Sequence, residues 1–121
     1  DLTYAASRKQ FGKALNEFEM VQERLANMAT DTAAARSLIY ASARSYDKGD
    51  RAMALGAMSK LFAAQAATRA GLDAIQILGG YGYMKEYPVE RYMRDAKLME
   101  IGAGTNEIMR ILIARSLVPE E

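Results

Sequence analysis

The amino-acid sequence predicts an all-α fold, an antiparallel helical bundle. Two long stretches carry stripes of mainly apolar residues three or four positions apart, and in the first stretch the steps alternate between four and three, which keeps those residues on one face of an α-helix. Glycine-containing breaks separate the predicted helices, and no segment alternates apolar and polar residues for long enough to predict a strand. With 121 residues, the chain is expected to form one domain, over residues 1–121.

The composition excludes several classes of function. The net charge of +1 gives no reason to expect nucleic acid or an acidic membrane surface as a partner. No apolar run approaches the roughly 18 residues that cross a bilayer. The chain contains neither Cys nor His, so disulfides, thiol chemistry and the commonest metal ligand and general base are missing. We therefore expect no metal site, and any chemistry must use carboxylates, Lys, Tyr or a bound cofactor.

The chain begins with a short helical segment and a turn. Residues 1–7 read as the last turns of a helix whose beginning is missing, and the chain opens without Met, so we expect a piece of a longer protein. A polar break follows at residues 8–13, with Gly12 at its turn. Asn16, with Glu19 three residues later, has the capping-box pattern and predicts the start of the first long helix.

The two long helices are predicted to be antiparallel neighbours. Their connection is very short; in it Gly49 suits the position after a C-cap and Asp50 suits an N-cap. The apolar stripe of the first helix comprises Val21, Leu25, Met28, Thr32, Ala35, Ile39, Ser42 and Tyr46. The second helix is predicted over about residues 51–78, with a stripe of Leu55, Met58, Phe62, Gln65, Thr68, Leu72, Ile75 and Leu78. Small residues in the first stripe predict close approach by a neighbouring helix.

Two further helices are predicted after the Gly79-Gly80 break, which ends the second long helix. Pro88 suits the first turn of a short, charged helix, where Glu90 complements the helix dipole. Thr105 is predicted as the N-cap of the last helix, which runs to about Leu117.

Three stretches contain residue types that could bind a ligand. Arg8, Gln10 and Phe11 place a cation suited to phosphate, an amide and an aromatic ring within four residues. Taken alone, they also read as a solvated loop with one anchoring Phe. Residues 102–107 precede and open a helix, whose free N–H groups can bind an oxyanion or a carbonyl oxygen. An ordinary capped helix start is the alternative there.

The third stretch runs from Gln76 to Gly82 and contains three glycines. A dinucleotide-binding fingerprint needs a strand before its glycines, whereas a helix precedes them here, so the pattern alone favours a helix stop. Gln76 is then either a surface residue or a ligand contact.

In their order and spacing, these motifs resemble one protein family. The chain contains Tyr4-Ala-x-x-Arg8-x-Gln-Phe-Gly12, Gln22-x-x-Leu-Ala26, Asp73-Ala-x-Gln76-x-x-Gly-Gly-x-Gly82, Glu86-Tyr-Pro-Val-Glu-Arg91, Arg94-Asp-Ala-Lys97 and Gly104-Thr-x-Glu107. Together they cover nearly the whole chain and strongly resemble the C-terminal domain of acyl-CoA dehydrogenases.

This resemblance implies a flavin enzyme. Members bind FAD and oxidise acyl-CoA thioesters to 2,3-enoyl-CoA: a base removes the α-proton while the β-hydrogen leaves as hydride to the flavin, and an electron-transferring flavoprotein accepts the electrons. The resemblance also implies a C-terminal four-helix bundle, of which the first helix is largely missing here, and a homo-oligomer. The expected location is the bacterial cytoplasm or the mitochondrial matrix.

The resemblance further implies which residues contact FAD. Arg8, Gln10 and Phe11 resemble the loop that reaches the diphosphate and adenine part of the cofactor. Gln76 and Gly80 resemble a contact to the same cofactor that is typically made across the subunit interface. Thr105 and Glu107 resemble positions near the diphosphate and adenine end.

Ala103 departs from the commonest form of the family. Many members have a Glu there that is the catalytic base, and alanine cannot accept a proton. The Gly102-Ala-Gly-Thr105 form resembles the isovaleryl-CoA dehydrogenase-like branch, which acts on branched-chain substrates and takes its base from the first helix of the bundle. No catalytic side chain is therefore assigned here, although the Ala103 N–H is expected to contact the thioester carbonyl. We expect the isolated chain to be inactive; a helical assembly module without catalysis, or a domain of an acyl-CoA oxidase, is the alternative.

Overall fold

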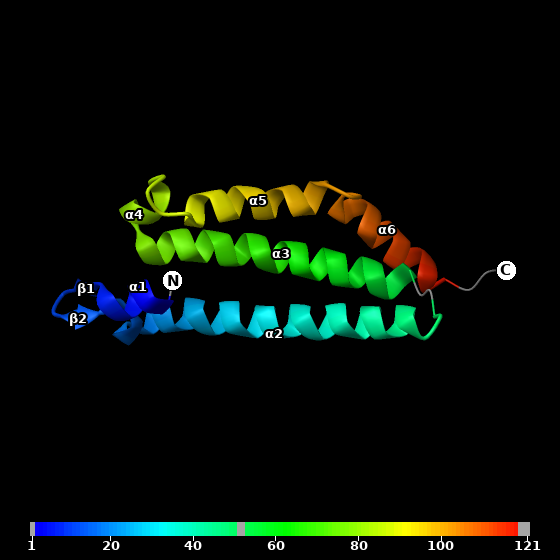
Figure 1. The fold of residues 1–121 in the computed structure, drawn as a ribbon, viewed down its shortest axis with the longest axis horizontal. Helices are drawn as coiled ribbons and strands as arrows, with labels where there is room; N and C mark the ends of the chain where they lie inside the picture. The colour runs from blue at the N-terminus through cyan, green and yellow to red at the C-terminus, as the bar shows by residue number, and fades with distance from the viewer. Residues whose placement is uncertain (1, 51–52, 119–121) are drawn as a thin grey trace.

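A computed structural model describes residues 2–50 and 53–118 of the chain. In chain order its elements are α1 (Leu2–Ser7), β1 (Lys9–Gln10), β2 (Lys13–Ala14), the 3-10 helix η1 (Leu15–Glu17), α2 (Glu19–Asp47), α3 (Met53–Leu78), α4 (Gly80–Tyr83), α5 (Val89–Ile101) and α6 (Asn106–Ser116). The long helix α3 lies in the middle, with α2 antiparallel along one side and α5 and α6 along the other (Figure 1). This arrangement confirms the predicted all-α antiparallel bundle.

The N-terminal segment forms a small hairpin that the sequence did not predict. Strands β1 and β2 pair Lys9 with Ala14 and Gln10 with Lys13. Between them, Phe11 and Gly12 have φ values of 52° and 84°. Two central residues with positive φ are typical of a two-residue hairpin turn. Strands of two residues are too short to produce a detectable alternation, so only the break at residues 8–13 could be predicted.

The prediction that Asn16 caps the first long helix is wrong. Asn16 lies inside η1, and α2 begins at Glu19, after Phe18, which makes no side-chain capping bond. The Glu17 carboxylate instead accepts the Ala14 N–H at 3.0 Å. Glu17 thus caps the start of η1, and among the described residues no carboxylate caps the start of α2. The reason is that the hairpin leads directly into η1.

The face of α2 that packs on α3 is only partly the predicted one. Val21, Leu25 and Met28 pack against the core as predicted, whereas Ile39 and Tyr46 are 43% and 65% exposed. After Met28 the partly buried face includes the residues one position before Thr32, Ile39 and Tyr46, so it is rotated around the helix from the predicted stripe. The partly buried positions after Met28 are Asp31, Ala34, Ala35, Leu38, Ala41, Ser42 and Ser45.

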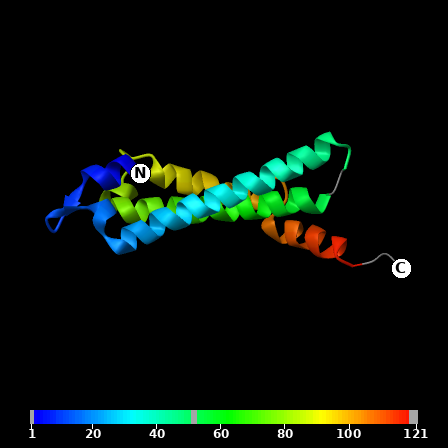
Figure 2. The ribbon, with the colours of Figure 1, turned by 90° about the horizontal axis from the view of Figure 1, so that it is seen from below.

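Helix α3 packs closely both on α2, where the Ser59 hydroxyl donates to the Leu38 carbonyl at 3.1 Å, and on α5. The buried residues of α3 are Ala57, Ser59, Ala64, Ala66, Gly71, Ala74, Ile77 and Leu78. A Cβ added at Gly71 would lie 2.8 Å from the Cα of Met93 on α5. Leu72, a member of the predicted stripe, is 53% exposed. Small residues dominate the buried set because α3 has helices on two sides (Figures 1 and 2).

The predicted helix ends are largely confirmed. Gly79 ends α3 with a φ of 61°, although Gly80 then opens the single turn α4. Gly49 follows the C-cap of α2 with a φ of 84°. Pro88 is the residue before α5, one position from its predicted place. The predicted start of the second long helix lies outside the described residues.

The apolar core gathers at the end of the molecule that holds α1. Its buried cluster comprises Ala5, Ala74, Ile77, Leu78 and Val89. Among the described residues, no large side chain is completely buried. None of the described helices combines the length and the apolar character needed to cross a membrane.

Glu100 on α5 makes stability depend on pH. The Thr68 hydroxyl, and after it Lys97 at 3.1 Å, lower the pKa of Glu100 from its usual 4.5. A lowered folded-state pKa stabilises the fold above about pH 4.5, and this contribution is lost as the pH falls through the folded-state value. We expect Glu100→Gln to lower the unfolding free energy by about 0.5 kcal/mol at neutral pH and by nothing in strong acid. Urea unfolding at several pH values checks this, with Glu23→Gln on exposed α2 surface as the control; an equal loss at all pH values contradicts it.

Candidate functional site

Three of the predicted site residues line one cavity. It has a volume of about 500 Å³ and lies where α1, β1 and α4 meet. Its lining comprises Tyr4, Arg8, Gln10, Leu15, Ile77, Leu78, Gly79, Gly80, Tyr81 and Met84. We call it the hairpin cavity. Its walls are mostly apolar and aromatic, with one cation and one amide, which is the usual make-up of a site for a cofactor or small molecule.

Arg8 is the charged residue of this lining, and its backbone is fixed on both sides. Its N–H donates to the Tyr4 carbonyl at 2.8 Å, and its carbonyl accepts the Leu15 N–H at 2.9 Å. Its guanidinium carbon lies 5.4 Å from the centroid of the Tyr81 ring. Within the part of the chain that the structure describes, no carboxylate pairs with it. The guanidinium can therefore bind an anion from outside.

Phe11 and Gln76 lie at the surface near the cavity and not in its lining. Phe11 is 94% exposed at the hairpin tip, with its ring edge-on to Phe18 at a centroid distance of 6.5 Å. Gln76 is exposed on the last turns of α3. A Cβ built at Gly80 would meet nothing within 4 Å. The open main chain at Gly80 and the uncovered ring of Phe11 are both accessible to a ligand that extends beyond the cavity.

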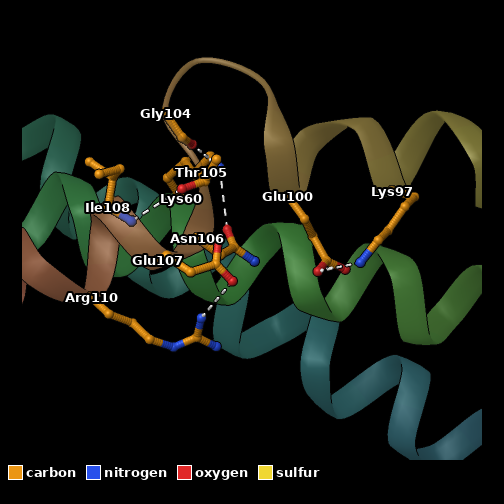
Figure 3. Close-up of polar contacts among 9 residues, drawn as sticks. All are labelled: Lys60, Lys97, Glu100, Gly104, Thr105, Asn106, Glu107, Ile108 and Arg110. Atoms are coloured by element: carbon orange, nitrogen blue, oxygen red, sulfur yellow. Dashed lines mark hydrogen bonds and ion pairs between the residues drawn. The ribbon is translucent and has the colours of Figure 1, made fainter.

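The other two predicted residues lie at the N-terminus of α6. The Thr105 hydroxyl accepts the Ile108 N–H at 3.3 Å, which confirms the predicted N-cap (Figure 3). Glu107 is in the first helical turn, exposed, with its carboxylate 3.9 Å from Arg110. This helix end offers unpaired backbone N–H groups and the positive end of the helix dipole, which together favour an anionic or carbonyl oxygen.

The loop before α6, residues 102–105, has an unusual backbone. Ala103 and Gly104 have φ values of 54° and 91°. Lys60 Nζ donates to the Gly104 carbonyl at 2.7 Å and to Asn106 Oδ1 at 3.2 Å (Figure 3). Ala103 is exposed, and its N–H has no hydrogen-bond acceptor within the described residues. That N–H is free to donate to a bound carbonyl oxygen.

The structure does not bring the two groups of residues together within one chain. Lys60, beside the 102–105 loop, and Leu78, beside the hairpin cavity, are both on α3. At 1.5 Å per residue, about 27 Å of helix separates them. The hairpin cavity and the α6 N-terminus are therefore two separate surfaces of one molecule.

Two residues that hold the 102–105 loop, Lys60 and Asn106, were not predicted as site residues from the sequence. Lys60 is 44 residues from its acceptor Gly104, and no motif surrounds it. One signal was present: Lys60 is the only charged residue between positions 53 and 68. An isolated charge in an apolar helix usually has a specific partner. Tyr81, which lies under Arg8, carried no comparable signal.

Comparisons with known proteins support one family. A family model described as "Acyl-CoA dehydrogenase, C-terminal domain" matches residues 2–118. The chain is 50% identical over 119 residues to cyclohexane-1-carbonyl-CoA dehydrogenase of Geobacter metallireducens, covering 98% of this chain and 31% of that protein. It is also 50% identical over 120 residues to mitochondrial isovaleryl-CoA dehydrogenase of Oryza sativa subsp. japonica, covering 98% of this chain and 29% of that protein.

A solved structure supports the fold. The structure described as "FAD complex of PigA" superposes with a TM-score of 0.93 at 38% identity, covering 96% of this chain and 30% of that one. The chain thus spans about 30% of the length of the proteins it matches. These matches confirm the family resemblance found in the sequence motifs.

Proposed function

The chain belongs to the acyl-CoA dehydrogenase family, as its C-terminal domain, and on this basis we propose that it contacts FAD and joins subunits in an enzyme that oxidises acyl-CoA thioesters. The observation that carries the proposal is the hairpin cavity, where Arg8 from the residue after α1, Gln10 from β1 and Gly80 from α4 come together. Gln10 and Gly80 are 70 positions apart in the sequence, and both belong to motifs that resemble FAD contacts of the family.

The residues of the hairpin cavity fit the diphosphate and adenine part of FAD. Arg8 supplies a fixed cation without a carboxylate partner among the described residues, and a guanidinium binds phosphate oxygens in bidentate fashion. The exposed ring of Phe11 can stack on a planar base. Gly80 lets a ligand approach the main chain, because its missing side chain leaves open space. Gln76 adds an amide on the adjacent surface.

The α6 N-terminus also fits the diphosphate and adenine end of FAD. Thr105 can donate its hydroxyl proton while its oxygen caps the helix, and the first-turn N–H groups favour phosphate oxygens. Glu107 presents an exposed carboxylate to a donor group. Because about 27 Å of α3 separates this end from the hairpin cavity, we propose that one FAD uses the α6 end of one copy and the hairpin cavity of a second copy. A homo-oligomer follows from this arrangement.

The chemistry of the 102–105 loop is that of a carbonyl site. FAD, when bound, supplies the acceptor for the hydride that leaves the substrate. The Ala103 N–H, which is exposed, donates to the thioester carbonyl oxygen and stabilises the negative charge that develops there when the α-proton is removed. The Ala103 methyl group accepts no proton, so the base is a residue outside this loop. We propose a branched acyl-CoA as the substrate, an electron-transferring flavoprotein as the electron acceptor, and the bacterial cytoplasm or mitochondrial matrix as the location.

Flavin binding and flavin reduction test this proposal separately. We expect the purified chain to bind added FAD, seen as quenching of flavin fluorescence, and not to bleach the flavin when isovaleryl-CoA is added without oxygen. The reason is that the chain provides cofactor contacts but no base at position 103. Absence of FAD binding contradicts the cofactor role, whereas bleaching by the chain alone contradicts the assignment of the base to another segment.

An assembly role without catalysis is the second candidate, and a specific surface favours it. A groove of about 360 Å³ along α2 and α3 is lined by Thr32, Ala35, Arg36, Ile39, Tyr40, Ala63, Ala66, Ala67 and Ala70. Apolar surface of this kind favours self-association. We expect a dimer or larger oligomer by light scattering at micromolar concentration, and a monomer speaks against both the assembly role and the shared FAD site. Oligomers without flavin binding favour the assembly role alone.

A further inference from the structure

Lys60 is an isolated charge in the middle of α3. No other charged residue occurs between positions 53 and 68, and its side chain is half-buried. Its ammonium group reaches across to the start of α6, where it donates to the Gly104 carbonyl at 2.7 Å and to Asn106 Oδ1 at 3.2 Å (Figure 3). One cation therefore binds both sides of Thr105, the N-cap of α6.

The loop that Lys60 contacts does not have a relaxed backbone. Ala103 has a φ of 54°, a region that residues with a Cβ adopt only when the surroundings hold them there. Gly104 follows with a φ of 91°, and a Cβ on it would lie 2.8 Å from Cε of Met109. The loop thus lies against α6 on one side, through Met109, and is held by Lys60 on another.

The side chain of Asn106, which Lys60 contacts, is buried, and its amide nitrogen is unsatisfied within the part of the chain that the structure describes. Its side chain is 97% buried, with a relative exposure of 3%, and its Nδ2 has no hydrogen-bond partner among the described residues. A buried amide with unused donors is unfavourable. The hydrogen bond that this side chain makes is the one its Oδ1 accepts from Lys60 Nζ. Lys60 and Asn106 therefore together fix the start of α6.

We propose that Lys60 is a positioning residue that holds the 102–105 loop so that the Ala103 N–H faces the thioester carbonyl. Lys60 acts through the loop and touches neither substrate nor cofactor. The Gly104 carbonyl lies in the peptide unit that joins Gly104 to Thr105, two units after the one that carries the Ala103 N–H. Because Ala103 and Gly104, which link these units, both have positive φ values, holding the Gly104 carbonyl limits how far the Ala103 N–H can turn. The role in substrate binding rests on the proposed function, whereas the role in holding the loop rests on the contacts of this chain alone.

Amide hydrogen exchange tests the holding of the loop. We expect Lys60→Met, which keeps the length of the side chain and removes its charge and donors, to raise exchange at the Ile108 and Met109 amides by roughly 10-fold or more. Those amides are the ones bonded to Thr105. Lys60→Arg, which keeps charge and donors, should restore most of the protection. Lys97→Met, which removes a neighbouring cation on α5 paired with Glu100, should leave these amides unchanged.

Steady-state kinetics tests whether Lys60 positions the Ala103 N–H for the reaction, in the FAD-loaded protein that carries this chain. A contact that strengthens as negative charge develops on the carbonyl oxygen affects kcat more than KM. We therefore expect Lys60→Met to lower kcat per bound flavin by roughly 10- to 100-fold, less than the loss of a whole oxyanion donor, with KM changed by less than about 3-fold. Lys60→Arg should recover kcat, and Lys97→Met should not change it.

These outcomes distinguish a failure of the role proposed for Lys60 from a failure of the proposed function. Faster exchange with an unchanged kcat per flavin means that Lys60 supports the fold only and overturns the positioning role. Unchanged exchange overturns the holding of the loop whatever the kinetics. If the unsubstituted protein oxidises no acyl-CoA, the proposed function fails together with the substrate part, and the exchange rates alone decide whether Lys60 holds the loop.

Discussion

Gly71→Ala is expected to destabilise the fold, whereas Gly56→Ala in the same helix is expected to stabilise it. The added Cβ at position 71 would lie 2.8 Å from the Cα of Met93, which is backbone and cannot rotate away. Overpacking of this kind costs about 1–3 kcal/mol. At position 56 the nearest atom is Ser42 Oγ at 3.8 Å, an ordinary contact, so Ala gains about 0.5–1 kcal/mol of helix propensity.

The matched pair removes helix propensity from the comparison. Both substitutions add one methyl group to α3, so we expect their unfolding free energies to differ by the overpacking cost alone, about 1–3 kcal/mol, or roughly 5–15 °C in Tm. Gly71→Val should lose about 3 kcal/mol or more, because a branched side chain cannot fit between the backbones of α3 and α5. Thermal and urea unfolding provide the measurement. Equal stabilities for the two Ala variants would show that α5 moves away from α3 without loss.

Arg8→Gln is expected to weaken FAD binding by about 100-fold. The guanidinium is the cation of the hairpin cavity, and a charge-assisted hydrogen bond contributes about 1.5–3 kcal/mol. Gln keeps a polar side chain of similar reach and leaves the backbone contacts of residue 8 in place, so the fold should be unaffected. Fluorescence titration of FAD gives the Kd. Lys85→Gln, on the exposed connection after α4, is the control; an equal effect there would mean that net charge alone attracts the cofactor.

Mixing two defective variants tests whether one FAD uses two copies of the chain. Arg8→Gln damages the hairpin cavity, and Thr105→Ala damages the α6 end. If each FAD site takes one surface from each copy, a mixed dimer contains one intact site and one doubly damaged site, so about a quarter of all sites should regain the original affinity. No recovery after unfolding and refolding the two variants together contradicts the shared site. The contrast is sharp because each variant alone provides no intact site.

Local chemistry made much of the fold predictable from the sequence. Gly49 and Gly79 adopt the positive φ that ended the predicted helices, and Thr105 caps α6 through its own hydroxyl. These features depend only on residues that are neighbours in the sequence, so the sequence is enough to predict them. The family could be named for the same reason, since its motifs are short stretches with a fixed order.

Features that depend on long-range packing could not be predicted in this way. Beyond Met28, Asp31, Leu38 and Ser45 are partly buried where the predicted stripe had Thr32, Ile39 and Tyr46, because packing against α3 decides which face of α2 is covered. Asn16 had the sequence of a cap, but the hairpin before it leads into η1, so the cap was not needed there. In both cases the position of another element decided the outcome: which residues of α2 are buried, and which residue caps a helix.

The sequence alone determined the all-α class and most helix ends, because periodicity and capping are local properties. Its resemblance to a family supplied the candidate residues at positions 8, 10, 11, 76, 80, 105 and 107. Only the tertiary structure decided how those residues are grouped. It places Arg8 and Gln10 beside Gly80 and separates them from Thr105 by about 27 Å of α3. It also makes Lys60 the partner of Gly104. The reason is that α3 packs against α6, which brings the Lys60 side chain to a loop 44 residues later in the sequence.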